Sequence, residues 1–328
     1  MNTRVMLLAL LLVLLALPAL AAPPTYPCYR PTVAPVIDGD VAGDPGWQSI
    51  PSATGFSVLG NGYAVAKQTA ARLCWTDAGL YIGVVCEEPD ARLLKPQAFD
   101  GGDTWAEDSL EIFIQPKGSG DAFQFGVTPS GAKGGFEGHP DITKVKAAGQ
   151  IGADSYSVEM FIPWAVVSAT LPGAGDKWRG DVCRNIFTTK SGGDKFTCWA
   201  PLQSRFLEPD NFATIAFQAA SLSPDEVGKI TEQLNAPYRQ LLVQQVAAAT
   251  AQYAAYREGL QAAVGDEKYG EQARQLMHDW RNLERLGRDA EQADILQMRA
   301  ALVKLGQLNR DSYEVKYQCL IRQLLREN

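Results

Sequence analysis

Trp105 and Glu111 are the residues whose types and spacing point most directly to binding chemistry. Trp105 comes just before segment 109–115, in which aliphatic side chains alternate with polar ones and with Glu111. This alternation predicts a strand with one buried face and one solvated face, and it places Glu111 on the solvated face. An aromatic ring can stack on the C–H face of a sugar, and a carboxylate can accept hydrogen bonds from its hydroxyls. The pair therefore indicates carbohydrate binding, with packing of Trp105 in the core as the alternative.

Catalytic patterns are weak in this sequence, and we expect no catalytic residues. The only two histidines, His139 and His278, fall in regions of different composition, and no Gly-x-Ser-x-Gly motif is present. Glu111 and Glu159 could form the carboxylate pair of a glycoside hydrolase. Both are expected on solvated strand faces, where exposure alone explains them. Glycoside hydrolase activity remains the alternative to binding without cleavage.

Several short motifs carry a resemblance to a known family. In chain order they are Val36–Gly39, Leu73–Gly83, Trp105–Ile114, Tyr156–Trp164, Arg184-Asn185, Trp199–Pro201 and Asn211–Ala213. Together they resemble family 9 carbohydrate-binding modules over about residues 26–218. The resemblance implies a β-sandwich that often carries structural calcium and holds a sugar between two tryptophan rings. Many such modules accompany glycoside hydrolases, which suggests a role accessory to polysaccharide breakdown.

The same resemblance assigns five sugar-contacting positions. They are Trp105 and Trp199 as the two rings, Glu111 as the carboxylate, and Asn185 and Gln124 as further polar partners. The sequence departs from the family at Gly126, where the resemblance implies an arginine. Glycine at that position removes a donor that could hold a hydroxyl bidentately.

Four acidic residues are candidate calcium ligands, because calcium prefers carboxylate oxygens. They are Asp38, Asp40, Glu107 and Asp108. The alternative for all four is a carboxylate that binds no metal, with a role in turn formation for the two aspartates of the first loop. No Cys-x-x-Cys pair is present, so a zinc site is not expected.

The six cysteines are relevant because an oxidising compartment would permit disulfides. Cys183 and Cys198 flank a predicted hairpin formed by 182–188 and 195–200. Their positions centre on the loop, so they could face each other across the two strands. We therefore consider a Cys183–Cys198 disulfide and a pair of free thiols as equal alternatives.

The elements that position these residues fall into two regions. Residues 22–220 hold 24 of the 30 glycines and alternate in the manner of short strands, which predicts a mainly β chain folded as an antiparallel, jelly-roll-like β-sandwich. The expected strands are 71–75, 80–86, 109–115, 122–128, 156–162 and 212–217, with the hairpin above. Thr76–Gly79 is expected to form a tight turn between the first two.

Residues 221–328 predict an α-helical hairpin or bundle. Ser223-Pro224-Asp225-Glu226 has the layout of a capped helix start. Apolar residues then recur at spacings of three and four in three runs, the last beginning at Ile295 and expected to continue to Leu324. Trp280 is expected at a surface or an interface. The region could dock another protein or associate with itself.

The first 21 residues have the layout of a secretory signal peptide, with a basic start, an apolar run and a small-residue exit ending at Ala21. We expect a secreted or periplasmic protein with no membrane span after cleavage. The excess negative charge lies before residue 222 and argues against nucleic-acid or anionic-lipid partners. A carbohydrate is the expected partner. The alternative is a structural protein of the cell envelope with a degenerate sugar site and a helical docking arm.

Overall fold

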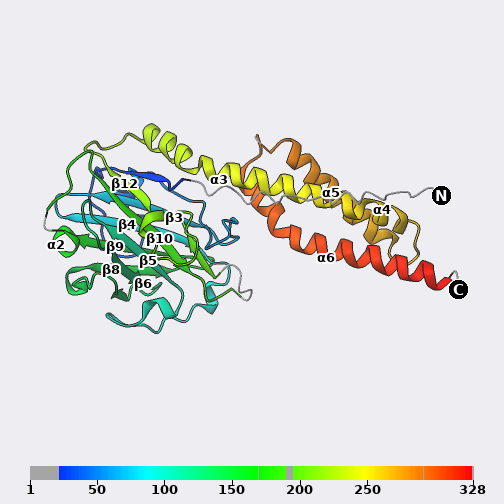
Figure 1. Ribbon diagram of the computed structural model, residues 1–328, viewed down its shortest axis with the longest axis horizontal. Helices are drawn as coiled ribbons and strands as arrows, with labels where there is room; N and C mark the ends of the chain where they lie inside the picture. Colours follow the sequence, from blue (N-terminus) through cyan, green and yellow to red (C-terminus); the bar gives the residue numbers. More distant parts are fainter. Residues whose placement is uncertain (1–21, 169, 190–194, 291, 327–328) are drawn as a thin grey trace, which may run out of the picture.

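The computed structural model describes residues 22–168, 170–189, 195–290 and 292–326. Figure 1 shows a β-sandwich with a long helical region extending from one side. This arrangement confirms the predicted fold class. The expected signal peptide, residues 1–21, lies outside the described residues.

The first sheet has eight strands and carries the candidate binding residues. Its main order is β1-β12-β10-β5-β6-β7, and β11 joins β10 to β2. The strands are β1 (Thr25–Cys28), β2 (Ser57–Val58), β5 (Ser109–Gln115), β6 (Phe123–Val127), β7 (Lys133–Gly135), β10 (Lys177–Asn185), β11 (Phe196–Cys198) and β12 (Ala213–Phe217). All pairs are antiparallel except β1 with β12, so this sheet is mixed.

The second sheet has four strands in the order β3-β4-β9-β8. They are β3 (Thr69–Trp75), β4 (Gly79–Glu87), β8 (Lys146–Ile151) and β9 (Ser155–Pro163). Trp75 pairs with Leu80 across the predicted β3–β4 hairpin. Two four-residue helices, α1 (Pro45–Gln48) and α2 (Trp164–Val167), lie in the connections.

The core lies between the two sheets and follows the alternation read from the sequence. Leu110, Ile112 and Ile114 of β5 face inward and meet Val158 and Met160 of β9 in one buried cluster. Apolar side chains from both sheets thereby leave water together, which is the main stabilising contribution of a sandwich. The opposite, outward face of β5 carries Glu111.

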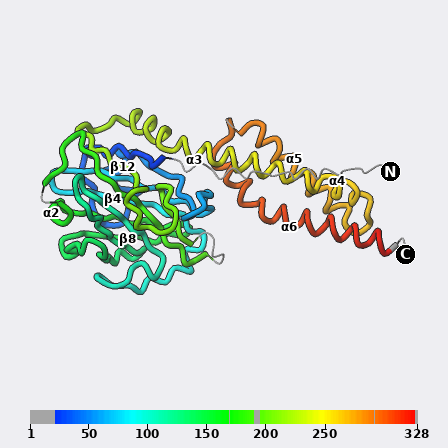
Figure 2. Tube along the Cα trace, viewed as in Figure 1, coloured from blue at the N-terminus to red at the C-terminus, as the bar shows by residue number. Residues whose placement is uncertain are grey.

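Four helices form the C-terminal region: α3 (Pro224–Gln252), α4 (Ala254–Ala263), α5 (Gly270–Arg288) and α6 (Ile295–Arg326). Ser223 and Glu226 form the predicted capping box at the start of α3. The Cα trace in Figure 2 shows α3 and α4 leading away from the sandwich, α5 returning and α6 leading away again. The antiparallel bundle buries the apolar runs predicted from spacing.

Two expectations for this bundle were wrong. Trp280 is fully buried, stacks on Tyr253 at a centroid distance of 5.3 Å and donates to Ser312 Oγ at 2.9 Å. The buried stripe of α6 continues through Val315 and Cys319, so Leu324 is an exposed residue. Positions that repeat every 3.5 residues drift slowly around a helix of 3.6 residues per turn. At the end of α6, Leu324 therefore lies on a different side of the helix from the buried stripe.

The bundle packs against one end of the sandwich through specific contacts. Thr54 N donates to Asn235 Oδ1 at 2.8 Å, and Arg299 Nη1 donates to Glu87 Oε1 at 2.9 Å. Gly55 has φ +90°, and a Cβ there would lie 2.6 Å from the Cβ of Tyr238. Glycine at this position therefore permits both the backbone conformation and the close approach of α3. In the described chain, no helix is long and apolar enough to span a membrane.

Candidate functional site

A single 3₁₀ turn, Thr104–Ala106, presents Trp105 at the start of β5. The Trp105 side chain is 48% exposed, whereas its neighbour Thr104 is fully buried. A tight turn directs adjacent side chains to different sides, so burying Thr104 places the indole ring outward. The Trp105 ring is therefore exposed just before β5, as a sugar-stacking role requires. Its contact with a sugar stays a prediction.

Glu111, Asn185 and Gln124 form one hydrogen-bonded group on the outer face of the eight-stranded sheet. Asn185 Nδ2 donates to Glu111 Oε1 at 2.8 Å, and Gln124 Nε2 donates to Glu111 Oε2 at 2.6 Å. The three residues come from β10, β5 and β6, which are neighbours in the sheet. Three of the five predicted positions therefore lie together, and Trp105 lies in the turn before β5, the strand that carries Glu111.

The carboxylate of Glu111 is less solvated than the strand pattern predicted. Only 6% of the residue is exposed, and burial raises the pKa of Glu111 above its ordinary value, while the two amide hydrogen bonds oppose that rise. The prediction of a wet face was wrong here. Alternation identifies the face on which a side chain lies, but it does not indicate what covers that face.

Glu159 shows the same error on the other side of the molecule. Its carboxylate is fully buried and accepts hydrogen bonds from Trp47 Nε1 at 2.6 Å and from the backbone of Asp38 and Gly39. It lies on the outer face of the four-stranded sheet, under the loop before α1. Because Glu111 and Glu159 lie on opposite outer faces with the core between them, they cannot act together on one glycosidic bond.

The structure does not place Trp199 opposite Trp105. Trp199 is partly buried, packs edge-on against Tyr26 at 6.1 Å and lines a small apolar cavity between the two sheets. Leu80 of one sheet and Ile112 of the other line the same cavity. A ring held in this way contributes to packing, so the assignment of Trp199 as the second platform is not supported by its position.

Two phenylalanines that the sequence reasoning missed lie at the edge of the group instead. Phe187 follows β10 and is 39% exposed, and its backbone N–H donates to Asp108 Oδ1 at 3.0 Å. Phe196 pairs with Asn185 across the β10–β11 hairpin and is similarly exposed. Two successive apolar residues, Ile186 and Phe187, follow the end of β10 at Asn185, and this break in alternation was the available signal.

The surroundings of Gly126 explain why this protein has no arginine at that position. Gly126 pairs directly with Glu111 in the β5–β6 register. A Cβ on Gly126 would lie only 1.9 Å from Thr104 Oγ1 and 3.2 Å from the ring of Phe136. Thr104 and Phe136 therefore occupy the space that a longer side chain on this strand would need.

The four candidate calcium ligands lie in two separate places. Asp38 and Asp40 accept backbone hydrogen bonds within the first loop, at 3.0 and 2.9 Å. Glu107 accepts from Gln97 N at 2.7 Å, and Asp108 accepts from the segment after β10. Among the described residues, no three His, Cys, Asp or Glu side chains gather in a metal-binding group. Asp108 contacts a segment about 80 residues later in the chain, and Glu107 Oε1 is buried without a hydrogen-bond partner. Calcium binding at these carboxylates therefore stays a prediction.

Cys183 and Cys198 face each other in the β10–β11 register, as the hairpin symmetry predicted. Their thiols are free, and each has its own acceptor. Cys183 Sγ donates to Asp181 Oδ2 at 3.7 Å, and Cys198 Sγ donates to the Ser57 carbonyl at 3.8 Å. Of the two alternatives for this pair, the structure contains free thiols.

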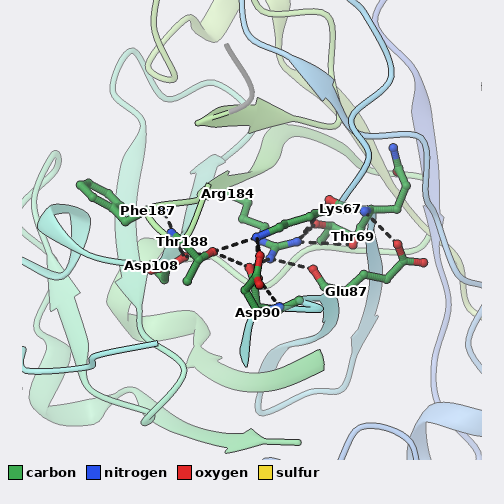
Figure 3. A network of polar contacts seen from close by, with 10 residues as sticks. Lys67, Thr69, Glu87, Asp90, Asp108, Arg184, Phe187 and Thr188 are labelled. Atoms are coloured by element: carbon green, nitrogen blue, oxygen red, sulfur yellow. Dashed lines mark hydrogen bonds and ion pairs between the residues drawn. The ribbon is translucent and has the colours of Figure 1, made fainter. Parts of the chain in front are cut away.

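A buried polar network lies behind Phe187 (Figure 3). Arg184 Nη2 lies 3.2 Å from Glu88 Oε2, and Thr188 Oγ1 donates to the same Glu88 oxygen at 2.7 Å. Lys67 Nζ contacts the other oxygen of Glu88 at 2.6 Å. In Figure 3 the Phe187 side chain points away from this network. The network fixes the backbone after β10, and with it the edge of the candidate site.

Comparison with known proteins places this geometry in a family. Residues 37–218 match the model of the family described as carbohydrate family 9 binding domain-like. The match covers more than half of the chain, and the protein belongs to this family. No curated protein matches the chain.

Solved structures of a module of this family are similar to the sandwich region. One is a family 9 carbohydrate-binding module from Caldicellulosiruptor kristjanssonii in complex with cellotriose, with 19% identity, 59% of this chain and 94% of that chain covered, and a TM-score of 0.45. Another is the same kind of module, from the same organism, in complex with glucose. It has 18% identity, 60% and 97% coverage, and a TM-score of 0.46.

Proposed function

We propose that this protein binds carbohydrate on the outer face of the eight-stranded sheet, without cleaving it. The observation that carries the proposal is the joint hydrogen bonding of Asn185 and Gln124 to Glu111, on the strand that follows the turn with the exposed ring of Trp105. Family membership and the ligands of the two solved relatives, cellotriose and glucose, support the same conclusion.

The chemistry of the group suits a sugar. The Trp105 ring offers a flat apolar surface for the C–H face of a pyranose, and the Glu111 carboxylate has lone pairs left to accept from hydroxyls. The two amides hold the carboxylate in one orientation, which lowers the ordering cost when a ligand binds. Phe187, held by Asp108 at the end of β10, takes the role of second ring that the sequence suggested for Trp199.

The expected signal peptide and the C-terminal helical region suggest where this binding would be used. Export through the N-terminal segment would bring the sandwich to extracellular or periplasmic polysaccharide, where a non-catalytic module could assist breakdown by other proteins.

The helical region supports a second candidate function as a docking arm. Apolar side chains on α6, among them Tyr313, Tyr317 and Leu320, are 39–56% exposed along one side of the helix. Mass measurement of the full chain in solution tests for self-association through α6.

Calorimetric titration with glucose and cellotriose tests the sugar site. We expect Trp105→Ala and Phe187→Ala to weaken binding about ten-fold or more, because each removes a stacking surface. The melting temperature should change little, since both rings are substantially exposed. Tyr313→Ala is the matched control, an exposed aromatic ring on α6 of the helical bundle. Undiminished affinity of Trp105→Ala for both sugars would refute the proposed site.

A further inference from the structure

The floor of the proposed sugar site carries a negative charge whose described partners are neutral. Glu111 receives its hydrogen bonds from two amide groups, those of Asn185 and Gln124. The cross-strand position that could have supplied a cation is Gly126, and Thr104 occupies the space above it. A carboxylate buried to this degree gains from a positively charged neighbour, because burial otherwise penalises its charge.

The hydrogen-bonding character of the floor is equally one-sided. Asn185 and Gln124 each direct an N–H donor to Glu111. Asn185 Nδ2 also donates to Ser109 Oγ at 3.1 Å, which uses its second N–H. The lone pairs of the carboxylate and the carbonyl oxygens of the two amides remain as acceptors, against one N–H of Gln124 as a donor. A ligand group with several donors and no acceptor matches this set better than a hydroxyl, which both donates and accepts. A primary ammonium group is such a donor.

A lysine side chain already contacts the two phenylalanine rings at the edge of the site, Phe187 and Phe196. Lys195 Nζ lies 3.8 Å from the centroid of the Phe187 ring and 5.3 Å from that of Phe196. Contacts of this kind are attractive because the face of an aromatic ring is electron-rich. The exposed Trp105 ring is the stronger cation partner of the same chemical type. Lys195 already occupies the Phe187 face, so the ring that remains for a cation on the ligand is Trp105, together with a carboxylate whose described hydrogen-bond donors are neutral.

We propose that this site prefers a cationic amino sugar, with a protonated amine on the pyranose ring, over a neutral hexose. The amine would approach Glu111 and the C–H face would stack on Trp105. This inference rests on the proposed function, since it names the class of sugar that the same site takes.

The test compares three monosaccharides of closely related shape by calorimetric titration of the mature protein at a mildly acidic pH, where the amine is protonated. Glucosamine carries the charge, glucose carries a hydroxyl at the same carbon, and N-acetylglucosamine carries a neutral amide there. We expect glucosamine to bind about ten-fold more tightly than either of the others. Glu111→Gln should reduce that preference to near parity, because the amide keeps an acceptor and loses the charge.

A second variant tests the ring without relying on a buried substitution. Trp105→Leu keeps apolar bulk at an exposed position and removes the aromatic face, so the ratio of glucosamine to glucose affinity should fall. Equal or tighter binding of glucose by the unaltered protein overturns the amino-sugar inference and leaves the proposed function in place. Failure of all three sugars and of cellotriose to bind overturns the proposed function itself.

Discussion

Arg184 and Glu88 form an ion pair in which both side chains are completely shielded from solvent. Arg184 comes from β10 of the eight-stranded sheet, and Glu88 follows β4 of the other sheet. Arg184 also donates to the Glu87 carbonyl at 2.9 Å. This pair links the two layers of the sandwich directly behind the residues that shape the proposed sugar site.

Removing one member of this pair should be strongly destabilising. Glu88→Gln leaves the buried Arg184 guanidinium without its carboxylate, and we expect it to lower the free energy of unfolding by about 3–5 kcal/mol. Arg184→Met should cost less, because Lys67 still pairs with Glu88 at 2.6 Å. The double variant should lose less than the sum of the two. Urea denaturation measures all three.

Arg179→Met is the matched control, because the Arg179–Asp210 pair is largely exposed. It should change stability by no more than about 1 kcal/mol. Equal effects of Arg179→Met and Arg184→Met would contradict the structural importance of the buried pair.

Asp181 should make stability depend on pH. Burial raises its pKa from 3.8 to about 7, against hydrogen bonds from Ala200 and Val182. The folded state therefore holds a proton that the unfolded chain releases, and stability should fall as pH rises from 3.8 to about 7, by up to about 4 kcal/mol. Asp181→Asn should flatten this dependence, measured by urea midpoints across the interval.

Glu208 provides the control for that experiment. Although its partial burial acts to raise the pKa, hydrogen bonds from Ser204, Gln203 and Asn211 lower it from 4.5 to about 2. Its contribution to stability is present above pH 4.5 and is lost as pH falls towards about 2. Glu208→Gln should therefore leave the slope between 4.5 and 7 unchanged, and a flattened slope in this variant would argue against Asp181 as its source.

Arg299 should hold the helical bundle against the sandwich. It donates to Glu87 Oε1 at 2.9 Å and to the Ala66 carbonyl at 3.0 Å. We expect Arg299→Ala to weaken this contact by about 1 kcal/mol and to speed proteolytic cleavage between the two regions. Lys304→Ala, at an exposed position on the same helix, is the control. Cleavage at the parent rate in Arg299→Ala would mean that other contacts hold the bundle.

The Cys183–Cys198 pair should remain reduced in the native protein. Each thiol donates to a different acceptor, and burial raises the pKa of Cys183 and Cys198 well above the ordinary value, which disfavours the reactive thiolate. Peptide mapping without a reducing agent should recover both as free thiols after denaturation in the presence of an alkylating agent. A recovered Cys183–Cys198 disulfide would contradict this expectation.

The strands and helices were largely readable from the sequence because their signals are local. The alternation around Ile112 predicted β5 with its observed bounds, and the capping residues predicted the start of α3. The parallel β1–β12 pair was not predicted, since its partners are about 190 residues apart in the chain. Pairing over such a distance leaves no local pattern.

The positions of site residues were predictable where their side chains lie on adjacent strands. They were not predictable where a turn or a distant loop determines the direction or the burial of a side chain. Glu111, Asn185 and Gln124 meet because β10, β5 and β6 are adjacent. Trp199 was assigned to the site from its place before the last strand, yet a short turn directs its ring toward Tyr26. Burial of Glu159 depends on a loop about 120 residues earlier in the sequence, which no strand pattern reveals.

The contact between Thr104 and Gly126 also restricts how this protein can change through successive substitutions. An arginine codon at position 126 would place its side chain against Thr104 Oγ1, so that single step is unfavourable in the present background. A smaller residue at position 104 would have to come first. The two positions are thus epistatic, and the order of their mutations decides whether a lineage of this protein can gain a basic group beside Glu111.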